Sequence, residues 1–110
     1  MKKMEIILNA IKEGVLIVDR EEKIEFINEA YAEFIGHSLE EVRGKLLTDI
    51  RPGAKLPEAM KKGEVQEQIH RVEKGKEYFV NMYPIRENGE VTGGISTVTF
   101  LENARFLAEK

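Results

Sequence analysis

The residue types best suited to catalysis are scarce in this 110-residue chain, which has two histidines and no cysteine. Without cysteine there is no disulfide, no thiolate zinc site and no thiol nucleophile. Two histidines alone give no obvious pair of nucleophile and base. The acidic residues are scattered, and none follows the spacing of a calcium-binding loop. These features predict a protein that is not an enzyme and that has no metal site.

Three residues in predicted strands, His70, Gly94 and Ser96, have features that a ligand site could use. His70 lies mid-strand, where an imidazole could bind an anion or sense pH. A surface or cross-strand position is the simpler interpretation, and His37 falls in a loop that we expect to be solvated. Gly94 and Ser96 are small where a core would favour bulk, which can mark the close approach of a ligand. A bulge at 93–94 explains their size equally well.

The composition predicts one folded domain. There are 17 basic and 20 acidic residues, a net charge of −3, and 42% of the residues are hydrophobic. Such evenly mixed charge gives no field for gathering nucleic acid. No window approaches the roughly 18 apolar residues that span a membrane, and the N-terminus does not resemble a secretory signal. We therefore expect a cytoplasmic protein that binds neither nucleic acid nor membrane directly.

The N-terminal region is predicted to be an amphipathic helix over residues 2–13. Its apolar residues recur at spacings of three and four, and they are Met4, Ile7, Leu8 and Ile11. A helix this short is marginal alone, and so apolar a stripe must be covered by its own sheet or by a second copy. We predict a homodimer with these four residues in the interface.

The middle of the chain predicts a hairpin followed by short helices. Strands at 15–18 and 23–27 flank a polar turn. Asn28 is a good N-cap for a helix over 29–35, and Ser38 with Glu41 forms a capping box for the next helix. An apolar turn follows at 46–50, and Pro57 suits the first turn of a helix that ends at Gly63.

The C-terminal part predicts three strands and the start of a helix. Strands at 65–72 and 78–85 flank a turn at 73–76, with Pro84 at the exit of the second strand. Asn88–Gly89 predicts a further hairpin to the last strand at 91–101. Together these elements predict an α+β fold: a five-stranded antiparallel sheet with short helices on one face. The expected division is a helix over 1–13, a core over 14–101 and the start of an output helix over 102–110.

The order of these elements and their local sequences resemble a PAS domain from about residue 6 to 101. The opening hairpin and first helix are similar in Gly14-Val15-Leu16-Ile17-Val18-Asp19 and in Ile24-Glu25-Phe26-Ile27-Asn28-Glu29-Ala30. The second helix is similar in Phe34-Ile35-Gly36 and Ser38-Leu39-Glu40-Glu41-Val42-Arg43-Gly44-Lys45, and the last strands in Val80-Asn81-Met82-Tyr83-Pro84-Ile85 and Val91-Thr92-Gly93-Gly94-Ile95. The segment 51–58 most resembles PAS modules of bacterial enhancer-binding transcription activators, and histidine kinases carry similar modules.

The resemblance implies a pocket between the inner face of the sheet and the short helices. Strand alternation puts Tyr78, Val80 and Met82 on one face, and likewise Gly94, Ser96 and Val98. Leu46 and Leu47 would help to close the pocket from the helical side. The alternative is that these residues simply fill a core. The predicted ligand-binding residues are Phe34, Ile50, Met60, His70, Tyr78, Val80, Met82, Gly94, Ser96 and Val98.

Several cofactors known from PAS domains do not suit this chain. The flavin photoadduct and the thioester-linked chromophore need a cysteine, and this chain has none. Haem usually takes a histidine from the helix before the third strand, but here that helix, at 57–62, contains no histidine. Non-covalent flavin or a small metabolite is compatible with the sequence, so the ligand is left open. Phe100-Leu101-Glu102 stands where the family often has an Asp-Ile-Thr-like triplet, so the resemblance does not extend to the usual polar latch between the domain and the output helix.

The function implied is a sensory module of a larger bacterial signalling protein. Such a module binds a small ligand, a partner PAS domain, or both, and passes the change to an output domain in a two-component system or a transcription regulator. One alternative is a structural dimerisation domain with a filled core and no ligand. A small isomerase or hydrolase using the same pocket is the alternative from a different class.

Overall fold

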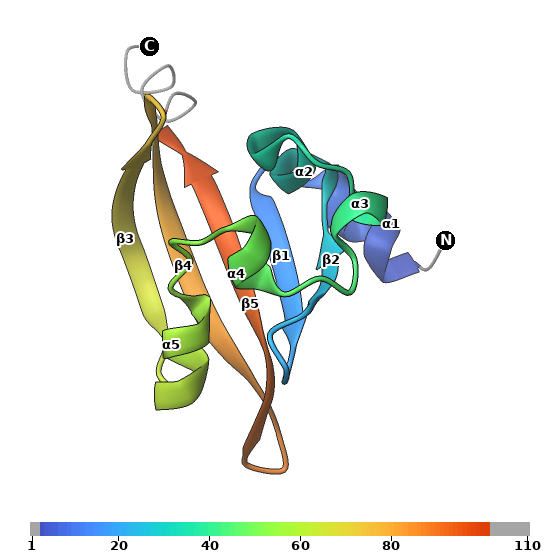
Figure 1. Cartoon of the computed structure of the whole chain (residues 1–110), viewed down its shortest axis with the longest axis vertical. Helices are drawn as coiled ribbons and strands as arrows, with labels where there is room; N and C mark the ends of the chain where they lie inside the picture. The colour runs from blue at the N-terminus through green and yellow to red at the C-terminus, as the bar shows by residue number, and fades with distance from the viewer. Residues whose placement is uncertain (1–2, 102–110) are drawn as a thin grey trace.

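The structure is a computed structural model that describes residues 3–101, and it consists of one antiparallel sheet with helices packed beside it (Figure 1). The five strands are β1 (Gly14–Asp19), β2 (Ile24–Ile27), β3 (Gln66–Glu73), β4 (Lys76–Glu87) and β5 (Glu90–Phe100). The helices are α1 (Lys3–Ala10), α2 (Glu29–Ile35), α3 (Leu39–Val42), α4 (Leu47–Ile50) and α5 (Leu56–Lys62). The predicted α+β class and the five-stranded antiparallel sheet are confirmed.

The sheet has the strand order β2-β1-β5-β4-β3, so the first hairpin adds to the edge of the C-terminal meander. The register pairs Ser96 of β5 with Leu16 of β1 on one side and with Met82 of β4 on the other. Directly paired residues in an antiparallel sheet project to the same face. These three side chains therefore form one row across the inner face of the sheet.

The helix boundaries follow the capping residues that the sequence predicts. The Asn28 side chain accepts a hydrogen bond from the backbone of Tyr31 at the start of α2. Ser38 and Glu41 form the complete capping box of α3. Gly36 and Gly63 end α2 and α5 in the left-handed conformation, with φ of 75° and 65°, which glycine adopts without steric cost.

Two local predictions need correction, and one cannot be compared. The first helix ends at Ala10 rather than at residue 13, because Gly14 already belongs to β1 and residues 11–13 form the connection. Pro84 lies inside β4 rather than at its exit. Its missing N–H is tolerated because the pairing with β3 stops at Met82, so β4 is locally an edge strand. The helix predicted over 102–110 lies outside the described residues.

The core lies between the inner face of the sheet and the helices that follow β2. Figure 1 shows α4 and α5 in front of the sheet, and α2 and α3 near its β1–β2 side. None of the helices within residues 3–101 has the length and apolar character to cross a membrane. The buried core cluster consists of Leu16, Val18, Ile24, Ile27, Tyr31, Val42, Leu47, Leu56, Ala59, Met60, Tyr78, Val80, Met82 and Val98.

Candidate functional site

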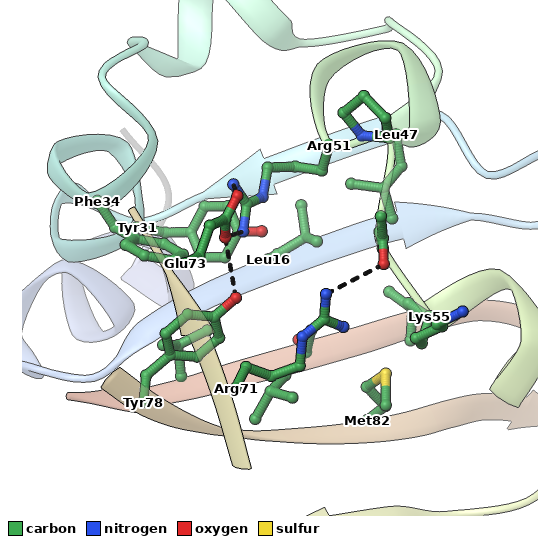
Figure 2. Close-up of a pocket in the computed structure, with 17 residues that line it drawn as sticks. Leu16, Tyr31, Phe34, Leu47, Arg51, Lys55, Arg71, Glu73, Tyr78 and Met82 are labelled. Atoms are coloured by element: carbon green, nitrogen blue, oxygen red, sulfur yellow. Dashed lines mark hydrogen bonds and ion pairs between the residues drawn. The ribbon is translucent and has the colours of Figure 1, made fainter. Parts of the chain in front are cut away.

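A cavity of about 70 Å³ lies between the inner face of the sheet and the segment that runs from α4 to α5 (Figure 2). That is room for a few water molecules or a short aliphatic group. A haem or a flavin needs a site of roughly 300 Å³ or more, so this cavity does not fit either cofactor. The residues around it are Leu16, Tyr31, Phe34, Leu47, Arg51, Pro52, Gly53, Ala54, Lys55, Leu56, Arg71, Glu73, Tyr78, Val80, Met82, Ser96 and Val98.

The floor of the cavity is apolar apart from one hydroxyl group. Leu16, Val80, Met82 and Val98 supply the apolar surface, and all four are buried. Ser96 is 5% exposed, and its hydroxyl makes no side-chain hydrogen bond to another described residue. The floor is thus suited to a small aliphatic group with one polar neighbour.

An ion pair between the helical cover and the edge strand lies at the mouth. Arg51, which follows α4, donates two hydrogen bonds to Glu73 of β3, at 2.9 and 2.6 Å. The Tyr78 hydroxyl donates to the same carboxylate at 3.0 Å. The hydrogen bonds from Arg51 hold the pKa of Glu73 below its usual 4.5, whereas burial raises the pKa of the Tyr78 hydroxyl.

The mouth carries more positive than negative charge. Arg71 donates a hydrogen bond of 3.4 Å to the Gly53 carbonyl, across the loop that precedes α5 (Figure 2). Neither Arg71 nor Lys55 forms an ion pair with any residue between 3 and 101. The lining therefore holds three cationic side chains against the single carboxylate of Glu73.

Six of the ten predicted ligand-binding residues do line this cavity. They are Phe34, Tyr78, Val80, Met82, Ser96 and Val98, and Leu47 joins them from α4. Their position follows from the strand alternation that the sequence predicts, because β4 and β5 each project alternate residues inward. Whether these residues contact a ligand stays a prediction.

The structure does not bring the other four residues, Ile50, Met60, His70 and Gly94, into the lining of this cavity. A Cβ at Gly94 would lie 2.9 Å from Met60 Sδ and 3.1 Å from Leu56 Cδ1, so Gly94 is small because α5 packs on it. Met60 fills that space, and half-buried Ile50 packs against the core. Leu46, predicted to help close the pocket, is instead exposed.

His70 lies on the other face of the sheet from the cavity. Its Nε2 is 2.9 Å from a carboxylate oxygen of Glu77, and its ring is 5.6 Å from that of Phe79. Its neighbour Arg71 is the residue that pairs with inward-facing Tyr78. His70 is thus a cross-strand surface residue, which is the simpler of the two interpretations that the sequence allowed.

Arg51, Arg71 and Glu73 were not predicted to belong to the site, although the sequence carries one signal for Arg71. Lys74 and Gly75 have φ of 50° and 79°, as a two-residue hairpin turn with two positive φ angles requires. A turn of that length fixes Arg71 opposite Tyr78, so the two must share a face. Nothing in the sequence places Arg51 beside Glu73, because the long-range packing of the α4–α5 segment brings them together.

A second polar feature joins α1 to the domain. The Asn28 side chain is fully buried, and its oxygen accepts from the backbone N–H groups of Val15 and Tyr31, at 2.8 and 3.0 Å. Its nitrogen donates to the carbonyls of Leu8 and Glu13, at 2.9 and 2.8 Å. We call this set of four hydrogen bonds the Asn28 junction. It connects α1, the connection after it, β1 and α2 through one side chain.

Two further hydrogen bonds support the same connection. Asn9 of α1 accepts from the backbone N–H of Glu29 at 2.9 Å, and Thr99 of β5 donates to the carboxylate of Glu13 at 2.6 Å. Helix α1 has no buried residue of its own. It is therefore attached to the rest of the domain chiefly through polar contacts near its C-terminal end.

The apolar stripe of α1 is largely uncovered. Met4, Ile7 and Ile11 are 65%, 51% and 41% exposed, and Ile6 is 57% exposed, while Leu8 is half-buried. An open groove of about 450 Å³ lies between the end of α1, α2 and the ends of β4 and β5. The predicted alternative in which this stripe packs on its own sheet does not hold for the described residues.

Comparison with protein families identifies one match over most of the chain. The family described as the PAS fold matches residues 8–101. In Halalkalibacterium halodurans, a probable C4-dicarboxylate sensor kinase is 33% identical over 102 residues, which cover 93% of this chain and 19% of that protein. The sensor protein CitS of the same bacterium is 31% identical over 108 residues, or 96% of this chain and 20% of that protein. The chain spans about a fifth of the length of these curated relatives.

Solved structures show the same fold at low sequence identity. The histidine kinase ThkA, in complex with the response regulator protein TrrA, superposes with a TM-score of 0.76 at 16% identity. The match covers 86% of this chain and 30% of that one. At this identity the likeness concerns the fold alone.

Proposed function

This chain belongs to the PAS family, and we propose that it is a sensory module of a bacterial sensor kinase, working in the cytoplasm, that relays the state of its cavity to its terminal segments. The relatives that it matches are sensor proteins of two-component type, which supports a signalling role. The names of those relatives describe whole proteins, and this chain matches only about a fifth of their length. We therefore do not assign the compounds in those names to this domain.

The Asn28 junction is the observation that carries the proposal. Tyr31 borders the cavity with its side chain and donates its backbone N–H to Asn28. Asn28 in turn holds the carbonyl of Leu8 in α1. A change in the cavity that moves Tyr31 is therefore two contacts away from α1. We propose that the buried Asn28 side chain, with all its hydrogen bonds made, passes that movement to α1.

We propose a binding role without catalysis. Both histidines lie on the surface, each beside a glutamate, with Nδ1 of His37 3.2 Å from Glu41 and Nε2 of His70 2.9 Å from Glu77. Neither borders the cavity. This arrangement supports a module that senses and relays over an enzyme that uses the same pocket.

We also propose that two copies associate through the exposed stripe of α1. The same stripe on a second copy is the simplest cover for it, because identical apolar surfaces are complementary in chemistry about a two-fold axis. The alternative function is a structural dimerisation domain with a filled core, which would use this interface but would have no relay from the cavity.

The relay can be tested without knowing the ligand. Ser96→Leu places an apolar side chain in the cavity, and hydrogen exchange measured by mass spectrometry then reports the amides of α1 and of residues 11–13. We expect altered exchange there in Ser96→Leu. The matched control is Ile95→Leu, on the same strand but on the outer face, which should leave exchange in α1 unchanged.

Unchanged exchange in α1 for a folded Ser96→Leu variant would overturn the relay and favour the dimerisation domain. Native mass spectrometry before and after denaturation adds an independent measurement. Extra mass that is retained in the native protein and lost on denaturation identifies a bound ligand and argues against a filled core.

A further inference from the structure

The cation-rich mouth of the cavity points to one chemical class of ligand, and this inference rests on the proposed sensory function. We propose that the cavity binds a short-chain aliphatic monocarboxylate, with its carboxylate on Arg71 and its chain over the apolar floor. The charge, the size and the floor of the cavity each support part of this assignment.

The two arginines of the lining differ in the hydrogen bonds that they already make. Arg51 is satisfied by Glu73 through two short hydrogen bonds. Arg71 has the same planar set of donors, yet among residues 3–101 its guanidinium makes one long bond, to the Gly53 carbonyl at 3.4 Å. Guanidinium groups bind carboxylates through two parallel hydrogen bonds, so Arg71 has donors left for an anion. Lys55 adds a second cation with no ion pair among those residues.

The local charge runs against that of the whole chain. The protein has a net charge of −3, yet the cavity lining combines Arg51, Lys55 and Arg71 with one carboxylate. Figure 2 shows the Arg71 guanidinium extending across the cavity toward the loop before α5, with the Arg51–Glu73 pair on the other side of it. An anion that enters here meets a positive mouth on an otherwise negative protein.

Size and polarity restrict which anion fits. A cavity of about 70 Å³ accommodates a chain of about two to four carbon atoms rather than a ring system. Leu16, Val80, Met82 and Val98 form a floor that would desolvate a phosphate without compensating hydrogen bonds. Glu73 at the mouth also disfavours an anion with two charges. A monocarboxylate with an apolar tail satisfies both ends of the site.

The first test compares an acid with its neutral analogue on the unmodified protein. Sodium butyrate and butyramide have nearly the same shape, and only butyrate carries the charge. At fixed pH and ionic strength, we expect butyrate to shift the backbone amide NMR signals of the cavity strands and of the Arg71 region in a saturable manner. Butyramide and inorganic phosphate should give no saturable shift at the same concentrations.

Variants then identify the residues responsible. Arg71→Gln should weaken butyrate binding about tenfold or more, as expected for the loss of a charge-assisted pair of hydrogen bonds. Arg43→Gln removes the same charge from an exposed residue outside the cavity and should bind as the wild type does. Ser96→Leu occupies the floor and should abolish binding, and amide spectra establish that each variant is folded.

The outcomes separate this inference from the proposed function. Equal binding of butyrate and butyramide, unchanged binding in folded Arg71→Gln, or no saturable shift with any short carboxylate overturns the monocarboxylate site. If that occurs while filling the cavity still alters exchange in α1, the relay stands with another ligand class. If exchange in α1 is unaffected as well, both the ligand assignment and the relay are overturned.

Discussion

At the scale of single residues, Asn28 has the most demanding position in the domain. A fully buried amide that uses both donors and accepts two backbone bonds cannot be replaced by a residue of similar size without leaving groups unpaired. Its sequence signal was that of an N-cap, which is only one of the four bonds. The other three depend on how α1 and β1 meet, and a local pattern does not contain that information.

Asn28→Ala should be strongly destabilising. It leaves two backbone N–H groups and two carbonyls without a side-chain partner, and we expect a loss of about 2–4 kcal/mol in the free energy of unfolding, measured with urea. Asn9→Ala is the matched control, because it removes one exposed hydrogen bond from the same connection and should cost about 0.5–1 kcal/mol. Equal effects of the two substitutions would mean that Asn28 has no special role.

Ser38→Ala tests the capping box of α3. The Ser38 hydroxyl accepts from the Glu41 N–H at 3.2 Å, and Glu41 accepts from the Ser38 N–H at 3.0 Å. Removing the hydroxyl should cost about 1 kcal/mol in thermal or urea unfolding, and Ser38→Asn should restore most of it, because asparagine is an equally good N-cap. A change within experimental error would mean that the helix starts elsewhere.

At the scale of elements, the features that the sequence predicts are those set by neighbouring residues. Caps at Asn28 and Ser38, glycine stops at Gly36 and Gly63, and inward alternation in β4 and β5 all depend on interactions within a few positions. The fold class followed from the order of these elements. The positions that the sequence did not predict depend on contacts between residues that are distant in the sequence.

Gly94 and the mouth of the cavity are the clearest examples of such long-range contacts. The small size of Gly94 predicts close approach correctly, but only the packing of α5 shows that the neighbour is Met60 rather than a ligand. The ion pair of Arg51 with Glu73 joins residues 22 positions apart in the chain. The face of His70 was ambiguous because β3 is an edge strand with few apolar residues to mark the inner side.

The Arg51–Glu73 pair predicts a specific dependence of stability on pH. Hydrogen bonds from Arg51 lower the pKa of Glu73 from 4.5 in the folded protein, so the pair stabilises the fold above that pH. This contribution is lost as the pH falls through the folded-state pKa. Because the Glu73 side chain is 36% exposed, we expect about 1 kcal/mol or less.

Comparison with Glu73→Gln isolates that contribution. The stability difference between the wild type and Glu73→Gln, measured by urea unfolding, should be largest near neutral pH and should shrink below about pH 4.5. Glu25→Gln, on an exposed position of β2, provides the control. A difference for Glu73→Gln that stays constant from neutral to acidic pH would show that the ion pair does not hold the cover on the sheet.

At the scale of the whole molecule, α1 stands apart from the other helices because none of its residues is buried. The sequence left two covers open for its apolar stripe, and the described part of the fold does not supply the internal one. Its C-terminal end is fixed by the Asn28 junction, whereas Met4 and Ile7 point away from the core. A helix held at one end and exposed along its length is suited to pass movement of the domain to a neighbouring chain.

Ile7→Asp tests whether that neighbour is a second copy. We expect sedimentation to show a concentration-dependent dimer for the wild type at high micromolar concentration and a monomer for Ile7→Asp, because a carboxylate in an apolar interface has no partner to offset its desolvation. Lys61→Asp places the same acid on an exposed position of α5 and should leave the dimer intact. A wild type that remains monomeric, with Ile7→Asp indistinguishable from it, would rule out self-association through α1. The exposed stripe would then have to meet a different chain.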